Sequence, residues 1–325
     1  MLKFVLRRML NYLILTSVAT VSAFFLASAA LKPRANYLGA NPPIPETSID
    51  NILTRLNMND KTPVTERFVV WAKGAVRGDF GLTHTGDPVN KEFGRRIGVS
   101  LRLLLIGSVL GATLGIALGV AGAVRQYKPS DYGVTVFSFV ILSTPVFLLA
   151  VLLKVAGIYV NQSLGQTIFY TTGEVTPGLV GAAAFVSRLK HLILPTLALT
   201  LGGLAGYSRY QRSTMLDVMG SDFLRTAQAK GLRRSQALIK HGLRTALIPM
   251  TTFFAYEFGL LITGAAFTEI IFGWHGMGEW VLESVTNNDI NAVVAVAAFT
   301  SVLILIAGTL SDLLHAALDP RVRVG

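Results

Sequence analysis

The chain of 325 residues contains no cysteine. Without thiols it can build neither a disulfide framework nor a thiolate nucleophile nor a thiolate metal site. Charged residues are also scarce, at 14%, whereas 52% of the residues are hydrophobic. An ordinary soluble domain has about 25% charged residues. This composition predicts a protein that lies in a membrane.

The sequence signatures of catalysis are missing as well. None of the five histidines begins a His-Glu-x-x-His motif, and no Gly-x-Ser-x-Gly motif occurs. The phosphate-binding loop Gly-x-x-x-x-Gly-Lys-Ser/Thr is absent too. We therefore expect no catalytic residues, no metal site and no enzyme activity on this chain, and any ATP hydrolysis coupled to it must take place on another chain.

Six segments are long and apolar enough for helices that cross a bilayer, which need about 20 residues each. The first is preceded by basic residues like a signal peptide, but its apolar run exceeds the usual length of about 7 to 15 residues, so we expect it to be retained. The predicted fold is an all-α integral membrane protein with six transmembrane helices. The predicted spans are residues 9–31, 100–124, 133–158, 189–207, 247–271 and 292–314.

Basic residues near the spans concentrate on one side of the membrane. They precede the first span, separate the second from the third, and follow the sixth. The positive-inside rule then places both termini in the cytoplasm. The connection between the fourth and fifth spans lies on the same side and contains eight basic and two acidic residues. We attribute the formal net charge of +11 to this arrangement and expect no nucleic-acid partner.

The unequal connections suggest distinct parts of the chain. A long proline-containing segment between the first two spans is expected to form a small folded extracytoplasmic cap, since long loops translocate regardless of charge. The predicted parts are the N-terminus with the first span (1–31), the cap (32–98), the permease core (99–314), a cytoplasmic coupling loop inside it (212–248) and a cytoplasmic tail (315–325).

The order of residues in the cytoplasmic loop predicts two short helices. Ser221 can cap a helix over 222–230, which has an acid in its first turn and Gly231 as its terminating residue. A second helical stretch, 234–247, leads to Pro249. Two helices joined at a glycine favour a rigid protrusion that docks a cytosolic partner, while the competing interpretation is a basic loop that only touches anionic lipid.

Several short motifs occur together along the chain. They are 192–196 (LILPT), Arg209, Arg212, 225–232 (RTAQAKGL), 243–249 (LRTALIP), 78–81 (GDFG), 269–272 (EIIF), 276–278 (GMG) and 319–321 (DPR). These motifs resemble the B-type membrane subunit of the oligopeptide and dipeptide permease family of ABC importers. Where the wider importer class has Glu-Ala-Ala, this chain has Arg225-Thr226-Ala227, and His275 stands where the family usually has proline.

The resemblance implies a site and partners. The chain would pair with a homologous C-type permease, two ATPase domains or subunits and an extracytoplasmic peptide-binding protein, in the plasma membrane of a bacterium. ATP and magnesium would bind to the ATPases, and no cofactor to this chain. Cargo could be an oligopeptide or dipeptide, or nickel or another small solute. The residues expected to couple to the ATPase are Asp222, Phe223, Arg225, Thr226, Ala227, Lys230 and Gly231.

Inside the membrane, glycine and proline mark special positions. A glycine at every fourth residue, namely Gly107, Gly111, Gly115 and Gly119, makes a smooth stripe on one helix face. Such a stripe lets another helix approach closely, either as static packing or as a sliding seam. Pro145 predicts a kink or break in the third span, where it either lines the pathway or makes a static bend, and Pro195 suggests the same for the fourth.

Glu257 lies in the middle of the fifth predicted span. A carboxylate there would cost about 3 kcal/mol if it faced lipid, so we expect it to face the interior of the bundle. It either lines the translocation pathway, where it can meet a peptide amino group, or makes a structural hydrogen bond. Glu269 and Lys154 are expected near the outer interface, with their charged ends reaching water.

A secondary transporter or channel for a small solute is the alternative function that the sequence leaves open. Six spans and one buried acid can support ion coupling. The absence of a second mid-membrane acid as a partner argues against it.

Overall fold

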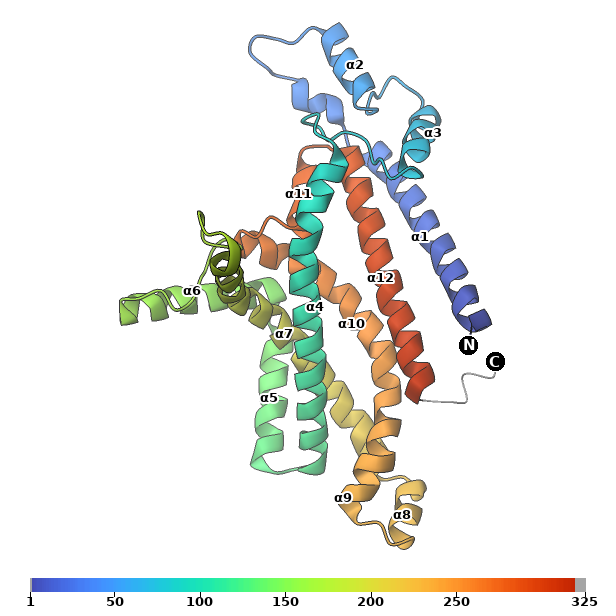
Figure 1. The fold of residues 1–325 in the computed structure, drawn as a ribbon, viewed down its shortest axis with the longest axis vertical. Helices are drawn as coiled ribbons and strands as arrows, with labels where there is room; N and C mark the ends of the chain where they lie inside the picture. The colour runs from blue at the N-terminus through green and yellow to red at the C-terminus, as the bar shows by residue number, and fades with distance from the viewer. Residues whose placement is uncertain (1, 319–325) are drawn as a thin grey trace. The chain divides into compact units, whose positions relative to one another are not determined.

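The computed structural model describes residues 2–318 and the side chains of residues 9–259 and 265–318. Within that range every regular element is a helix, apart from one isolated β-bridge between Leu82 and Pro88 (Figure 1). The chain divides into two compact units, which share the long helices α4 (Val89–Val124) and α12 (Ile290–Leu318). Residues 319–325 of the predicted tail, with the motif at 319–321, lie outside the described residues.

The first unit comprises Leu2–Ser100 and His275–Leu305. It includes the predicted cap, residues 32–98. The last ten residues of this segment are helical, because α4 begins at Val89 and continues into the second predicted span. Besides parts of α4 and α12, its elements are α1 (Leu2–Ala30), the 3-10 helix η1 (Pro33–Tyr37), α2 (Glu46–Arg55), α3 (Val64–Ala75) and α11 (Met277–Thr286).

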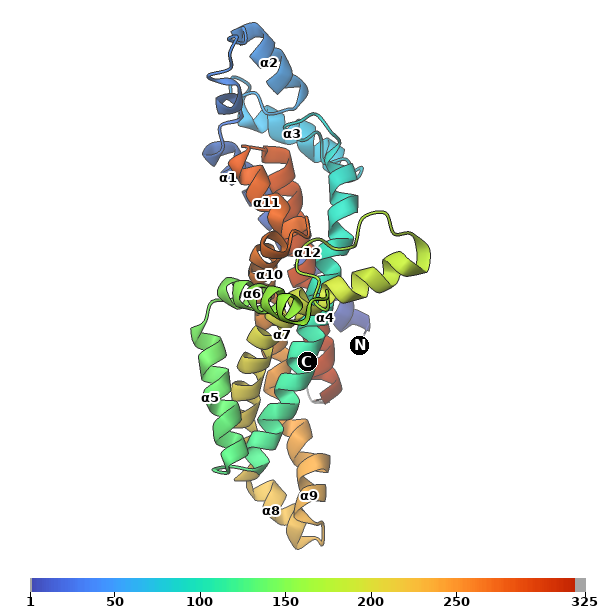
Figure 2. The ribbon, with the colours of Figure 1, turned by 90° about the vertical axis from the view of Figure 1, so that its left-hand side faces the viewer.

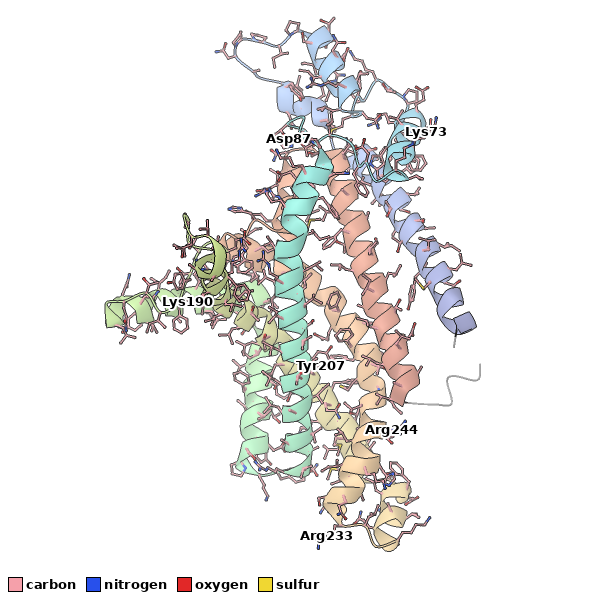
Figure 3. All side chains as sticks on the ribbon, in the orientation of Figure 1. Lys73, Asp87, Lys190, Tyr207, Arg233 and Arg244 are labelled. Atoms are coloured by element: carbon pink, nitrogen blue, oxygen red, sulfur yellow. The ribbon has the colours of Figure 1, made fainter. Side chains whose placement is uncertain are left out.

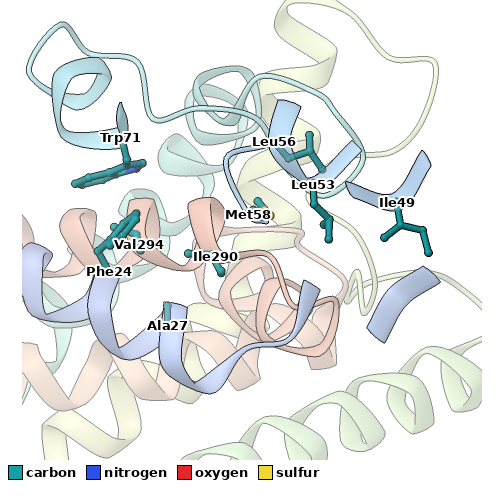
Figure 4. Packing of buried hydrophobic residues seen from close by; sticks show 9 residues of the cluster. All are labelled: Phe24, Ala27, Ile49, Leu53, Leu56, Met58, Trp71, Ile290 and Val294. Atoms are coloured by element: carbon teal, nitrogen blue, oxygen red, sulfur yellow. The ribbon is translucent and has the colours of Figure 1, made fainter. Parts of the chain in front are cut away.

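One hydrophobic core holds this unit together (Figure 4). Phe24 of α1, Leu53 of α2, Trp71 of α3 and Val294 of α12 meet in it, and the Phe24 and Trp71 rings lie 5.3 Å apart. Burying one large apolar side chain stabilises a fold by about 1.5–3 kcal/mol. The segment between the first two spans is therefore packed into a core that it shares with α1 and α12.

Polar groups fix the turns of the same unit. The Arg34 guanidinium lies 2.6 Å from carboxylate oxygens of both Asp50 and Asp60, and its hydrogen bond holds the pKa of Asp60 below its usual range. The Asn291 amide, at the start of α12, donates to the carbonyl oxygens of Leu56 and Leu82 at 2.9 Å each. These bonds satisfy carbonyls that no helix ladder reaches.

The second unit comprises Leu101–Trp274 and the chain from Ile306 onward. Besides parts of α4 and α12, its helices are α5 (Pro129–Ser143), α6 (Val146–Leu164), α7 (Gly181–Met219), α8 (Asp222–Ala229), α9 (Arg234–Ala237), the π-helical turn η2 (Leu238–Gly242) and α10 (Leu243–Phe272). Helices α8 and α9 project beyond the end of α5 (Figures 1 and 2).

The third predicted span, 133–158, is divided into two helices at Pro145, where the sequence predicted a kink or break. The chain breaks between α5 and α6, with Thr144 extended and Pro145 at the N-cap of α6. Proline disfavours a helical conformation in the residue before it, and the hydroxyls of Ser143 and Thr144 donate to carbonyls one turn back at 2.7 and 2.8 Å. In both views α6 runs across the direction of α5 (Figures 1 and 2).

Five helices among the described residues are long and apolar enough to cross a membrane. The fifth predicted span, 247–271, falls within α10, whose side chains at 260–264 are outside the described set. Helix α7 continues through Pro195 and changes direction along its length (Figure 2). The number of spans and the cytoplasmic position of the termini stay predictions. The candidate spans are Met9–Ala30, Val89–Val124, Val146–Leu164, Gly181–Met219 and Ile290–Leu318.

The glycine stripe of α4 lies directly against α7. A Cβ atom at Gly107 would lie 2.9 Å from the Cβ of Leu199, and one at Gly115 would lie 2.5 Å from the Cβ of Tyr207. At Gly119 it would lie 2.6 Å from the carbonyl oxygen of Ser208. Because these contacts advance along both helices together, any side chain larger than hydrogen would push the two backbones apart.

We predict that Gly115→Ala lowers the midpoint of thermal unfolding in detergent, because overpacking a close contact costs about 1–3 kcal/mol. Gly94→Ala on the same helix is the control, since a Cβ there meets nothing within 4 Å. Alanine also favours a helix over glycine, so the control should unfold at the same temperature as the wild type or higher. Equal midpoints for both variants would show that the α4–α7 contact is looser than described.

Candidate functional site

Helix α8 begins directly after the end of α7. Gly220 and Ser221 separate the two. Asp222 lies in the first turn of α8, where its negative charge interacts favourably with the helix dipole. Ser221 occupies the N-cap position, but its hydroxyl donates to the carbonyl of Val218 and makes no side-chain cap. The predicted capping bond is therefore wrong, because the hydroxyl turns back to satisfy a carbonyl at the end of α7.

The end of α8 is closed by a glycine-dependent turn. Gly231 has φ +92°, a conformation that costs other residues roughly 1–2 kcal/mol. Its N–H donates to the Gln228 carbonyl at 2.9 Å, and the Leu232 N–H donates to the Ala227 carbonyl at 3.3 Å. This pair of bonds is the Schellman motif, which satisfies the last helical carbonyls and turns the chain sharply toward α9.

Leu224 holds α8 against the bundle. It is only 2% exposed and packs in a cluster with residues from the ends of α4, α7, α9 and α10. The other members of this cluster are Ala123, Met215, Ala237, Leu238 and Ala246. A displacement of α8 would therefore have to move the ends of these helices or break the cluster.

The opposite side of α8 faces outward. The Phe223 ring is a large apolar group on the exposed side, whereas Ala227 is half-buried and packs against the cluster around Leu224. The exposed residues, together with Ala227, are the ones that the sequence assigns to ATPase coupling, and we call them the α8 surface. Its exposed members are Asp222, Phe223, Arg225, Thr226, Lys230 and Gly231.

The return path from α9 into the membrane is continuous helix. The π-helical turn η2 joins α9 to α10 without a break, and π-helical turns are frequent at functional sites. At the start of α10, Arg244 donates to the carbonyl oxygens of Leu318 and Ala317, at the end of α12. Figure 3 shows Arg233 near the turn between α8 and α9, and Arg244 beside α10 (Figure 3).

A buried ion pair ties α7 to the first turn of α5. The Arg212 guanidinium binds both carboxylate oxygens of Asp131, at 2.6 and 2.7 Å, and Asp131 is 3% exposed. The hydrogen bond from Arg212 lowers the pKa of Asp131, and the Tyr127 N–H adds a further bond. One turn earlier, the Arg209 guanidinium lies 4.1 Å from the centre of the Phe139 ring.

Sequence reasoning missed this pair because it placed both arginines in a cytoplasmic loop. The structure places them in the last three turns of α7. Arginine close to a span is what the positive-inside rule expects, so the charges alone did not reveal a partner. The one sequence feature that could have indicated the pair is Asp131, an acid just before the third predicted span.

The two residues predicted for the pathway both border the middle of α7. Val146, next to Pro145, lies against Gly202, with its methyl 3.5 Å from where a Cβ would be. Glu257 lies against Gly206, one turn further along, with Oε1 3.1 Å from the corresponding position. Small residues on α7 therefore bring the α5–α6 break and the carboxylate to neighbouring turns of one helix.

The expectation that Glu269 reaches water is wrong, because Glu269 is 0% exposed. Lys154 is half-buried, and its ammonium donates to the Ile271 carbonyl at the end of α10. There Trp274 and Gly273 N–H groups bond the carbonyls of Glu269 and Ile270, and the Gly173 N–H bonds that of Phe272. Each of the last four carbonyls of α10 thus has a partner, as a helix end away from water requires.

The geometry suits mechanical transmission. Helix α7 carries the α8 surface at one end, the ion pair to Asp131 a little further in, and the glycines beside Glu257 near its middle. Within the described residues, no group of three or more histidine or acidic side chains is arranged to hold a metal ion.

Residues 111–324 match the family described as "Binding-protein-dependent transport system inner membrane component". Among individual proteins, the chain is 50% identical to the oligopeptide transport system permease protein OppB of Mycobacterium tuberculosis, over 100% of both chains. It is 32% identical to the oligopeptide transport system permease protein AppB of Bacillus subtilis, over 99% of both.

Solved structures share the fold at lower identity. A chain of the MetNI methionine ABC transporter in an inward-facing conformation aligns with a TM-score of 0.52 and 15% identity, over 70% of this chain and 96% of that one. An amino acid ABC transporter gives 0.51 and 16%, over 70% and 94%. The relatives at 50% and 32% identity, both named oligopeptide permeases, disfavour the secondary transporter or channel. The chain belongs to the binding-protein-dependent transport system inner membrane component family, and it is a non-catalytic membrane permease subunit of an ABC importer.

Proposed function

We propose that this permease subunit conducts oligopeptides and that the α8 surface transmits the conformational change of the ATPases to its membrane helices. The observation that carries the proposal is the position of α8, which is exposed on one side and seated through Leu224 on four helix ends. The cargo follows from the relatives, since those at 50% and 32% identity over nearly the full length are named oligopeptide permeases.

The other subunits of the importer are proposed from what is typical of the same family. The chain pairs with a homologous C-type permease, and the pair is served by two ATPase domains or subunits that bind ATP and magnesium. An extracytoplasmic peptide-binding protein delivers the cargo on the other side. The complex lies in the bacterial plasma membrane, with six spans, both termini and α8 in the cytoplasm, and the segment 32–98 outside.

In this proposal, coupling is a movement of α8 that is transmitted to the ends of the membrane helices. When ATP binding closes the ATPases, they carry the α8 surface with them, and Leu224 transmits the movement to the ends of α4, α7 and α10. The Asp131–Arg212 pair makes the α4–α5 turn follow α7. A partner can drive a conformational change only as far as it binds the two states differently, and a protruding helix is a suitable element for such a bias.

The proposed pathway borders the middle of α7. Pro145 is the N-cap of α6, whose first residue, Val146, lies beside Gly202, and Glu257 lies beside Gly206. A break at Pro145 lets α6 change direction inside the membrane, where irregular backbone is tolerated only against protein or a water-filled cavity. Both residues are therefore assigned to the wall of the path that the two permeases enclose.

We predict that Gly231→Val abolishes peptide uptake by the reconstituted importer and uncouples its ATPase activity from cargo. A β-branched residue resists φ +92°, so the turn after α8 would open and tilt the α8 surface. Gly231→Asn is the matched control, because asparagine tolerates the left-handed region, and it should keep most of the uptake. Normal uptake by Gly231→Val, with the variant inserted and assembled, would contradict the role of α8.

A second variant tests the surface itself. Ala227→Asp adds a charge to a half-buried position on the α8 surface without changing the backbone. We expect loss of uptake and weaker co-purification of the ATPase with the membrane subunits, while the two permeases still co-purify with each other. Retained co-purification together with normal uptake would show that this position does not face the ATPase.

The Asp131–Arg212 pair predicts a pH dependence. Because the folded-state pKa of Asp131 is lowered, its contribution is present above the ordinary aspartate pKa and is lost as the pH falls through the lowered value. Asp131→Asn should destabilise the permease at neutral pH by up to about 3 kcal/mol, with the partial exposure of Arg212 reducing this. Thermal unfolding at pH 7 and below pH 4 should show a difference between wild type and variant that shrinks in acid. A constant difference would contradict the assignment.

A further inference from the structure

The carboxylate of Glu257 stands out because nothing in the described part of the chain pairs with it. No hydrogen bond or ion pair joins it to any described residue, and the residue is half-buried. Its Oε1 approaches the bare backbone of Gly206, where a side chain would block the space. An ionised carboxylate inside a membrane is normally paired or lies in a water-filled cavity.

Aromatic rings surround the same place. Phe253 lies one turn before Glu257 on α10 and contacts the same glycine, with its Cζ 3.6 Å from where a Cβ of Gly206 would be. The Tyr210 ring stacks on Phe253 at 4.8 Å, and the Tyr256 ring lies 6.2 Å from it. Tyr210 is 39% and Tyr256 63% exposed, so both present ring surface to whatever enters beside α7 and α10.

A partly exposed carboxylate with aromatic rings nearby is the chemistry that recognises an organic cation. The carboxylate supplies the counter-charge, and aromatic faces attract an ammonium group within about 6 Å of the ring centre. Lipid would be the wrong environment for this face, because an unpaired carboxylate there costs about 3 kcal/mol. The face must therefore meet either a passing cation or a basic group on a neighbouring subunit.

We infer that Glu257, Tyr210 and Tyr256 form a transit site for the ammonium groups of peptide cargo, either the α-amino group or a lysine side chain. This inference rests on the proposed transport function. A half-exposed site with one carboxylate binds such a group weakly, which suits a permease, because cargo that bound tightly on the way would not leave. The binding protein selects the peptide first, and the site then favours the passage of peptides that carry an ammonium group.

The test uses the complete importer in liposomes, with both permeases, the ATPases and the binding protein. Initial uptake rates are measured for two matched peptide pairs, one with lysine or Nε-acetyl-lysine at the same internal position, and one with a free or an acetylated N-terminus. The binding protein is the same throughout, so its own preference cancels when the ratio within each pair is compared between wild type and variant.

Glu257→Gln should lower the cationic-to-acetylated ratio at least fivefold for one or both pairs. Tyr210→Leu and Tyr256→Leu should lower it less, and Tyr210→Phe and Tyr256→Phe, which keep the rings, should leave it unchanged. Unchanged ratios in Glu257→Gln would overturn the transit site. An equal loss for both members of each pair would also overturn it and would point to an ion pair with the second permease. Failure of the wild-type importer to take up any peptide would overturn the proposed function instead.

Discussion

The contact between α4 and α7 is the constraint on which the membrane unit depends. Four glycines of α4 let the backbone of α7 approach so closely that a single methyl group at Gly115 or Gly119 would collide with it. Helix association in a bilayer gains little from the hydrophobic effect, so close backbone packing has to supply the attraction. Because α7 is held in this way, a movement of its C-terminal end can be transmitted to its middle.

Everything assigned to function is attached to α7 or lies against it. The α8 surface comes shortly after its last residue, the Asp131–Arg212 pair holds its last third, and Gly202 and Gly206 receive Val146 and Glu257. These two glycines, one turn apart, leave room for the neighbouring side chains. Helix α7 thus connects the exposed α8 surface at its end with an unpaired carboxylate of α10 that lies against its middle.

Local signals in the sequence predicted the short elements well and the long-range pairs poorly. The acid at Asp222 and the glycine at Gly231 define α8 because capping depends on neighbouring residues alone. The Asp131–Arg212 pair and the buried Glu269 could not be predicted, since composition near a span does not show which helix lies opposite. The split of the third span could be foreseen at Pro145, but its outcome, a second helix across the first, depends on packing against α7.

A crosslinking experiment tests the role of the α8 surface most directly. The chain has no cysteine, so a single introduced thiol is its only one. Thr226→Cys on α8 and, as a control, Tyr132→Cys at the exposed start of α5 are paired with single thiols on the ATPase through a short bifunctional reagent. The α8 thiol should crosslink to the ATPase with a yield that changes between ATP and ADP, and the control should not. No crosslink from Thr226→Cys in an importer that transports peptide would contradict the assignment of α8 as the coupling helix.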